Sequence, residues 1–353
     1  MKTITDSLTL PRLPGGIIAP YLKERSVAVF DIETMGLYAR QDEIILTGVL
    51  VPDEDFVDNN TSSGMVGAVR GRVIQFFSDM PGDEPEILRR TIEVLQQADI
   101  IVTYNGQSFD IPFLKQRAAK YGIPCELPGF HLDLFTFARV YTDLKQVIGS
   151  LSQKNVERYM GLASSRDDQI DGGESVRLFN RYRILASADS PEAAALEQKI
   201  LLHNHDDVVQ LYRILPLLLR TDLHRAMYHQ GFPAGRFVVK EIKTDRHGLT
   251  VTATPLPGCQ IADYMHFPTE SEPYNVMLSS ASETAEFTFP AEAAAPGVVV
   301  LDLIRLIGRE SASEMVRYPA VESGYLILRN GTEPNYMEIN AFIRCFLSQF
   351  DNA

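Results

Sequence analysis

The chain is 353 residues long, with 45% hydrophobic and 22% charged residues, which is typical of a globular protein of about two domains. Its three cysteines lie far apart and form no Cys-x-x-Cys pair, which disfavours a disulfide framework or a zinc site and favours a reducing, cytoplasmic setting. No apolar run is long enough for a membrane span or a signal peptide, so we expect neither membrane association nor secretion.

The net charge of −13 is spread over the whole chain. Residues 1–220 hold 23 basic and 30 acidic residues, and the remaining 10 basic and 16 acidic residues follow. A general affinity for polyanions is therefore not expected, although a local basic strip would still hold a phosphate backbone.

Strands and helices alternate in the first two thirds of the chain. Residues 1–24 are rich in proline and glycine and suggest an N-terminal arm, and residues 53–71 suggest a loop. Apolar patterns predict strands at 27–33, 43–52, 72–78 and 100–104, and helices at 85–99, 109–121 and 191–219. This order predicts an α/β domain over residues 25–220, with an antiparallel meander at its start.

Two acidic residues end the first of these strands. Asp31 and Glu33 are spaced i, i+2, so both carboxylates leave the same face of the strand. Like charges this close raise each other's pKa, and a divalent cation between them would relieve the repulsion. Hard oxygen ligands of this kind suit Mg²⁺ or Mn²⁺.

A second acidic motif, which contains Asp110, follows the strand at 100–104, in the segment Asn105-Gly106-Gln107-Ser108-Phe109-Asp110. Asp110 lies in the first turn of a predicted helix, where the helix dipole favours a carboxylate. Taken alone, a helix-capping role explains it at least as well as a catalytic role.

His203 and Asp207 lie in the long helix predicted at 191–219. Their i, i+4 spacing places them on one helix face. Taken alone, a histidine and an aspartate at this spacing would most simply lie on the solvent-exposed face of the helix.

Together, the three motifs resemble the DEDD superfamily of 3′→5′ exonucleases, and most of all its YprB-type RNase H-like branch. The resemblance extends over residues 26–218 and includes His131-Leu132-Asp133-Leu134 and residues 151–162. It implies an RNase H-like mixed sheet flanked by helices. It also implies a phosphodiesterase that uses two divalent ions, Mg²⁺ or Mn²⁺, held by Asp31, Glu33, Asp110 and Asp207.

The general base departs from the superfamily pattern. His203 stands at the spacing that other members fill with tyrosine, and Leu202 stands where other members place histidine. An imidazole can take a proton from water at neutral pH, so His203 is the candidate base, with His205 or Asp206 as alternatives.

Candidate substrate contacts adjoin these motifs. They are Thr34, Asn105, Phe109, Lys154 and Arg158. Core packing explains Phe109 and its neighbour Ile111 equally well. The most basic stretch carries Lys145, Lys154, Arg158, Arg166, Arg177, Arg181 and Arg183, with Tyr159 and Tyr182 between them. It would form either a groove for a single strand or a solvated surface paired with Asp167, Asp168, Asp171 and Glu174.

Residues 221–353 have a different character. They predict a small α+β domain with a hairpin turning at residues 245–248, further short strands, a short Ala-rich linker at 293–295 and a helix at 336–350. No catalytic motif is evident in this accessory domain, which would bind nucleic acid, a partner or the nuclease domain itself. Its net charge of −6 makes nucleic acid the least favoured of the three.

The sequence therefore predicts a 3′→5′ exonuclease that acts on a single-stranded DNA or RNA 3′ end. The resemblance also implies a helicase or repair partner. The rival hypotheses are an RNase H-like endonuclease, a non-catalytic nucleic-acid-binding module that works with a helicase, and an α/β protein whose acids are merely caps and surface groups.

Overall fold

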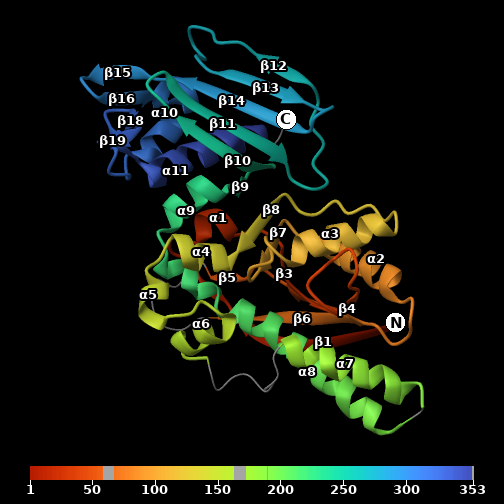
Figure 1. Cartoon of the computed structure of the whole chain (residues 1–353). Coiled ribbons are helices and arrows are strands. Elements are labelled where there is room, and N and C mark those ends of the chain that lie inside the picture. Colours follow the sequence, from red (N-terminus) through yellow and green to blue (C-terminus); the bar gives the residue numbers. More distant parts are fainter. Residues whose placement is uncertain (59–66, 163–171, 189, 352–353) are drawn as a thin grey trace. The chain divides into compact units, whose positions relative to one another are not determined.

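The computed structural model describes residues 1–58, 67–162, 172–188 and 190–351, and the chain divides into two compact units (Figure 1). The first unit is Met1–Thr221 and the second is Asp222–Ala353. No helix in the described part of the chain is long and apolar enough to cross a membrane.

The first unit contains a mixed sheet of six strands. In spatial order they are β1 (Lys2–Pro11), β6 (Ala68–Phe77), β4 (Ile44–Pro52), β3 (Val27–Thr34), β7 (Ile100–Thr103) and β8 (Phe130–Asp133). β1, β6, β4 and β3 pair antiparallel in succession, and β3 pairs in parallel with β7, which pairs in parallel with β8. The predicted fold class, a mixed sheet that begins with an antiparallel meander, is confirmed.

The N-terminal residues form an edge strand of this sheet and not a separate arm. β1 pairs with β6 along its whole length, from Lys2 opposite Phe77 to Pro11 opposite Ala68. This segment forms a strand because its apolar residues alternate with polar ones. Ile4, Leu8 and Leu10 turn toward the protein, while most residues between them are exposed. The prolines that suggested an arm lie at and beyond the end of β1.

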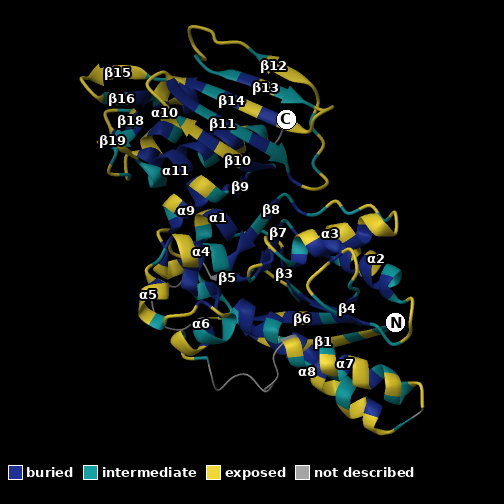
Figure 2. Cartoon of the chain, viewed as in Figure 1, coloured by how far each residue is buried: buried dark blue, intermediate teal, exposed yellow. Residues whose placement is uncertain are grey.

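Helices cover both faces of the sheet (Figure 1). On one face lie α2 (Glu84–Leu95) and α3 (Asp110–Lys120), where Thr47 Oγ1 of β4 and Thr91 Oγ1 of α2 are 2.6 Å apart. On the other lie α7 (Gly172–Ala186) and α8 (Glu192–Arg213), where Phe179 packs edge-on against Phe77 of β6. The central strands β4, β3 and β7 are largely buried (Figure 2), which explains their nearly continuous apolar sequences.

A buried ion pair joins α2 and α3. Glu84 accepts hydrogen bonds from the Arg117 guanidinium, and neither side chain is more than 3% exposed. Arg117 also donates to the carbonyl of Ala39, and the backbone N–H of Ile44 donates to Glu84. The pair therefore fixes the loop between β3 and β4, which begins directly after Thr34, one residue beyond Glu33.

Shorter elements complete the first unit. They are β2 (Leu13–Pro14), β5 (Val57–Asp58), α1 (Ala19–Leu22), α4 (Leu134–Val140), α5 (Leu144–Ile148), α6 (Gln153–Tyr159) and the 3-10 helix at Leu215–Arg220. The helix predicted at 191–219 ends at Arg213, and the chain continues as a 3-10 helix that has Pro216 near its start.

The second unit contains two antiparallel sheets. The larger has the order β12 (Tyr264–His266), β13 (Asn275–Ser279), β14 (Thr284–Pro290), β11 (Gly248–Pro255), β10 (Phe237–Thr244) and β9 (Phe232–Ala234). The smaller has the order β15 (Glu292–Ala295), β16 (Val298–Asp302), β18 (Tyr325–Ile327) and β17 (Val321–Glu322). The remaining elements are α9 (Leu223–Gln230), α10 (Leu303–Met315), β19 (Arg329–Asn330), β20 (Glu333–Pro334), α11 (Tyr336–Leu347) and a 3-10 helix at Ser348–Phe350.

Two predictions for this unit have clear outcomes. The hairpin that turns at residues 245–248 is confirmed by the antiparallel pairing of β10 and β11. The alanine-rich linker is wrong, because Glu292–Ala295 forms β15, an edge strand paired with β16. Its four exposed residues give no alternating pattern from which a strand could be inferred.

Candidate active site

The strand β3 and the helix α8 bring three candidate site residues together. His203 Nε2 lies 3.5 Å from Glu33 Oε1 and 3.5 Å from Asp207 Oδ2. Glu33 and His203 are buried, and Asp207 keeps 17% of its side chain exposed. The sequence of α8 alone favoured a solvated surface for His203 and Asp207, but the structure places the pair beside Glu33 instead.

Asp31 is held from α8 by an asparagine. Asn204 Nδ2 donates to Asp31 Oδ2 at 2.9 Å, and Asn204 Oδ1 accepts from Gln75 Nε2 at 2.9 Å. Gly48 pairs with Asp31 on one side and with Gln75 on the other, so the asparagine spans three strands across a glycine. A Cβ at Gly48 would lie 2.2 Å from Asn204 Oδ1, which shows that the glycine makes room for this bridge.

Asp110 connects the start of α3 to β3. Its Oδ1 accepts from the backbone N–H of Ile32, the residue between Asp31 and Glu33. Asp110 is itself the first residue of α3, and the preceding Phe109 makes no side-chain capping bond. The carboxylate therefore bonds to β3, which argues against a role confined to capping its own helix.

Asp133, at the end of β8, stabilises the turn that leads to Asp110. It accepts from the backbone N–H groups of Asn105 at 2.8 Å and Gln107 at 3.1 Å, and it caps α4 by accepting from Phe135. Asn105 has a φ of 63°, a conformation that asparagine tolerates better than most residues. The asparagine of the motif thus has a conformational role at this turn.

Burial and mutual repulsion raise the pKa values of the carboxyl groups. Burial is the largest cause for Glu33 and for Asp110, and it raises the pKa of each to about 7. The pKa of Asp31 is raised well above its usual range by burial and by the charges of Asp207, Asp110 and Glu33, although Asn204 opposes the rise. Part of the Asp31 surface remains accessible, but its carboxylate lies deep enough for desolvation to dominate.

This donor set suits a divalent cation. Ligand atoms of Glu33, His203 and Asp207 all lie within 4.8 Å of one another, which is close enough to share one ion. Asp31 and Asp110 add two carboxylates whose charges act on the same cluster. Oxygen-rich sites with several acids match the preferences of Mg²⁺ and Mn²⁺, whose charge would offset the repulsion.

The two alternatives to His203 have different neighbours. His205 Nε2 lies 3.2 Å from Asp6 Oδ2 of β1, and its Nδ1 lies 3.6 Å from Asp206. These contacts engage His205 with the edge strand, whereas His203 faces Glu33. The geometry therefore favours His203 as the candidate base.

The predicted substrate contacts of the acidic motifs lie in different environments. Thr34 is buried, and its hydroxyl donates to the carbonyl of Gly36 at 2.6 Å. The Asn105 residue is exposed. Phe109 is partly buried and packs against Phe113, with ring centroids 5.4 Å apart, and it also lines an open hollow of about 340 Å³ beside the exposed Leu37 and Tyr38.

The helix α6 places the two basic candidates near the site. Gln153 Nε2 donates to the backbone carbonyl of Asp207 at 3.0 Å. Lys154, which is partly buried, and Arg158, which is exposed, follow on the same short helix. Both residues therefore lie on an element that contacts the site-bearing part of α8.

The proposed aromatic members of the basic stretch do not form a stacking surface. Tyr182 is buried, and its hydroxyl donates to Asp79 Oδ1 at 2.7 Å. Tyr159 is exposed, but the Arg220 guanidinium covers its ring at 4.9 Å. Arg166, Asp167, Asp168 and Asp171 lie outside the described residues.

Sequence reasoning missed Asn204, Gln75 and Gly48. Asn204 lies inside the third motif, but its neighbours His203 and His205 are the more familiar catalytic types. The one available signal was Gly48, an isolated glycine within an apolar strand, which often marks a close approach by another group.

The sheet order, the two helical layers and the acidic cluster together define an RNase H-like α/β domain. Residues 28–219 match the family model described as the RNase H superfamily. The match covers more than half of the chain, and the chain therefore belongs to this superfamily.

Segments of the chain are similar to DNA polymerases. One alignment is 30% identical over 107 residues to a DNA polymerase of Pyrococcus glycovorans, covering 30% of this chain and 13% of that protein. Another is 49% identical over 45 residues to a DNA polymerase of Methanocaldococcus jannaschii, covering 13% and 3%. A third is 39% identical over 49 residues to a DNA polymerase of Thermococcus litoralis, again covering 13% and 3%.

These alignments span only a small part of the polymerases, between 3% and 13% of their lengths. Among solved structures, the family B DNA polymerase of the hyperthermophilic archaeon Pyrobaculum calidifontis aligns with 99% of this chain and 51% of its own, at 14% identity and a TM-score of 0.40.

Proposed function

We propose that the chain is a metal-dependent 3′→5′ exonuclease that hydrolyses phosphodiester bonds at DNA or RNA ends. The observation that carries the proposal is the convergence of Asp31, Glu33, Asp110 and Asp207, from three separate segments, around His203. Membership of the RNase H superfamily and the similarity to DNA polymerases support it.

The protein groups divide the chemistry between them. Two divalent cations held by the four acids would supply positive charge to the scissile phosphate and lower the pKa of the attacking water. With the cations held by the four acids and not by His203, the His203 Nε2 would accept a proton from that water, whose oxygen forms the new bond to phosphorus. The bond from phosphorus to the 3′ oxygen then breaks. That oxygen takes up a proton and stays on the shortened strand as its new 3′ hydroxyl, and a nucleoside monophosphate leaves.

The test is hydrolysis of labelled single-stranded DNA and RNA of one sequence with Mn²⁺, with Mg²⁺ or with chelator. We expect metal-dependent cleavage that Asp31→Asn reduces by about a hundredfold to a thousandfold, since a charged ligand is lost from the site. Glu93→Gln, which removes an exposed acid of α2, is the matched control and should retain full activity.

The outcomes separate the rival hypotheses. Cutting of circular single-stranded DNA would identify an endonuclease. Binding without hydrolysis under every metal condition would indicate a non-catalytic module, for which a helicase partner remains a proposal from the sequence resemblance. Equal activity in Asp31→Asn would remove Asp31 from the site.

A further inference from the structure

The second unit contains an open pocket of about 620 Å³ with an unusual charge for this acidic part of the chain. Three turns build it, and its lining includes Arg246, His247, Arg329, Val299, Gly297 and Gly331. We refer to it as the arginine pocket. We propose that it binds the phosphodiester backbone of a nucleic acid strand; the choice of nucleic acid rests on the proposed function.

Neither guanidinium group of the arginine pocket forms an ion pair with a carboxylate of the described residues, although the charge of Arg246 helps to lower the pKa of the neighbouring Asp245. Arg246 Nε donates to His247 Nε2 at 3.0 Å, and Arg329 donates to the carbonyl and hydroxyl oxygens of Thr244. Within the same part of the chain, neither arginine lies at ion-pair distance from a carboxylate. Each guanidinium carries five N–H donors, so both retain donors and full charge for an anion.

The one carboxylate in the lining is engaged by the backbone. Asp245 accepts hydrogen bonds from the N–H groups of His247 at 2.7 Å and Gly248 at 3.0 Å, which closes the β10–β11 turn. These bonds also lower the pKa of Asp245 and stabilise its charge inside the turn. Gly297 and Gly331 have φ values of 81° and 65°, and a Cβ at either position would meet no atom within 4 Å, so their backbones leave the pocket open.

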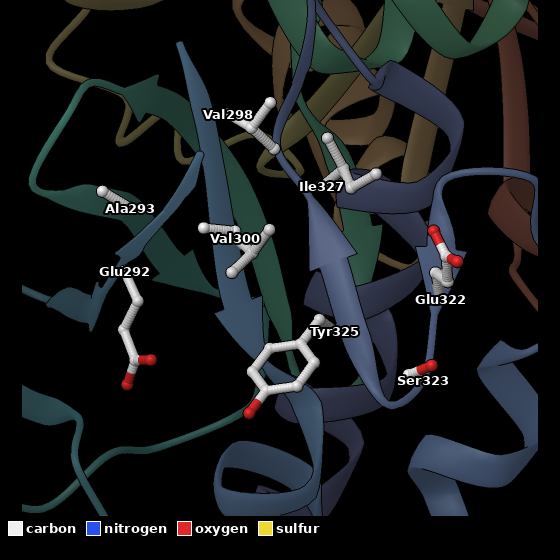
Figure 3. A pocket seen from close by; sticks show the side chains of 9 residues that line it. Glu292, Ala293, Val298, Val300, Glu322, Ser323, Tyr325 and Ile327 are labelled. Carbon is white, nitrogen blue, oxygen red and sulfur yellow. The ribbon is translucent and has the colours of Figure 1, made fainter. Parts of the chain in front are cut away.

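A neighbouring pocket shows that the positive charge is confined to the arginine pocket. Val298 and Val300 turn to the other side of β16 from Val299, and there Figure 3 shows an apolar groove with Glu292 and Glu322 on opposite sides. Two carboxylates make that groove unsuitable for an anion. The unit as a whole carries 10 basic and 16 acidic residues, so phosphate binding would be confined to the arginine pocket.

The experiment measures binding of a fluorescent oligodeoxythymidylate by anisotropy across a salt series, in chelator and in the Asp31→Asn background, so that the strand stays intact. Arg246→Gln and Arg329→Gln should each weaken binding by roughly fivefold to tenfold and reduce the slope of log K against log salt by about 0.7, the value for one phosphate contact on a single strand. Arg246→Lys should keep the slope. Arg309→Gln, an exposed arginine of α10, is the matched control for loss of one charge.

The result that overturns the proposal is an unchanged affinity and slope in Arg246→Gln, an exposed position that leaves the fold intact. Binding of inorganic phosphate in the parent, lost in the variants without any change for the oligonucleotide, would assign the pocket to free phosphate and also overturn it. Because no step requires hydrolysis, a protein that never cleaves DNA can still show the slope change. If the chain is active, the pocket variants should hydrolyse bis(p-nitrophenyl) phosphate at the parent rate while their KM for DNA rises.

Discussion

Replacing Gly48 by alanine should damage the candidate active site without changing any of its acids. The new Cβ would lie 2.2 Å from Oδ1 of Asn204 and 3.0 Å from its Nδ2, far inside contact distance. Asn204 is fully buried between Gln75 and Asp31, so it has no open space into which to move. The substitution must therefore displace the amide that orients the Asp31 carboxylate.

Two costs follow from this displacement. Overpacking of a buried site costs about 1–3 kcal/mol of unfolding free energy. Loss of the hydrogen bond to the ionised Asp31 costs about 1.5–3 kcal/mol of metal-binding free energy. This corresponds to a loss of roughly tenfold to hundredfold in Mn²⁺ affinity. We expect kcat for DNA hydrolysis to fall by a similar factor.

The matched control is Gly71→Ala on β6. Its Cβ would lie 2.6 Å from Leu10 Cδ1 and 3.3 Å from the Val51 carbonyl, so it produces comparable crowding away from the acids. Calorimetric Mn²⁺ titration, hydrolysis rates and urea unfolding should show destabilisation in both variants but a loss of metal affinity in Gly48→Ala alone. Parent-like metal binding and turnover in a folded Gly48→Ala protein would refute the role assigned to Asn204.

Two further predictions concern stability. Glu33 has a pKa of about 7 against an ordinary value of 4.5, so the folded protein binds more protons than the unfolded chain between these values. Without metal, Glu33 alone should make the free energy of unfolding fall by about 3 kcal/mol as pH rises through this window, and Asp110 and Asp31, whose pKa values are also raised, should make the measured fall larger. Thermal melts in chelator should show this fall, and Mn²⁺ should reverse it at about pH 8. A melting temperature that does not change with pH would contradict the burial of Glu33. Separately, Glu84→Gln should lower the free energy of unfolding by about 3–5 kcal/mol, because it leaves the buried Arg117 charge uncompensated. Urea titration beside the exposed control Glu86→Gln, expected to cost less than about 1 kcal/mol, measures this difference.

The sequence was sufficient to predict four of the six strands of the first sheet and the meeting of Glu33, His203 and Asp207. Strand and helix periodicities located β3, β4, β7, α2 and α3, and the motif order indicated that Glu33, His203 and Asp207 meet. Their metal-binding and catalytic roles stay predictions. Spacing of i, i+2 and i, i+4 is local information, so it is available without a structure.

Features that depend on pairing between distant segments were not predictable. The Asn204 bridge requires the register that aligns Asp31, Gly48 and Gln75 across three strands, and nothing local encodes that register. The arginine pocket is likewise assembled from three turns far apart in the sequence. β1 was different, because its alternation at Ile4, Leu8 and Leu10 was present but the nearby prolines obscured it.

The central claim is stepwise hydrolysis from a 3′ end at the cluster of acids around His203. The most direct test is a time course with 5′-labelled single-stranded DNA and RNA in Mn²⁺, run beside Asp31→Asn and His203→Ala. We expect a ladder that shortens one nucleotide at a time, requires metal, and is absent in Asp31→Asn. An intact substrate with every metal, or a ladder of equal rate in Asp31→Asn, would contradict it.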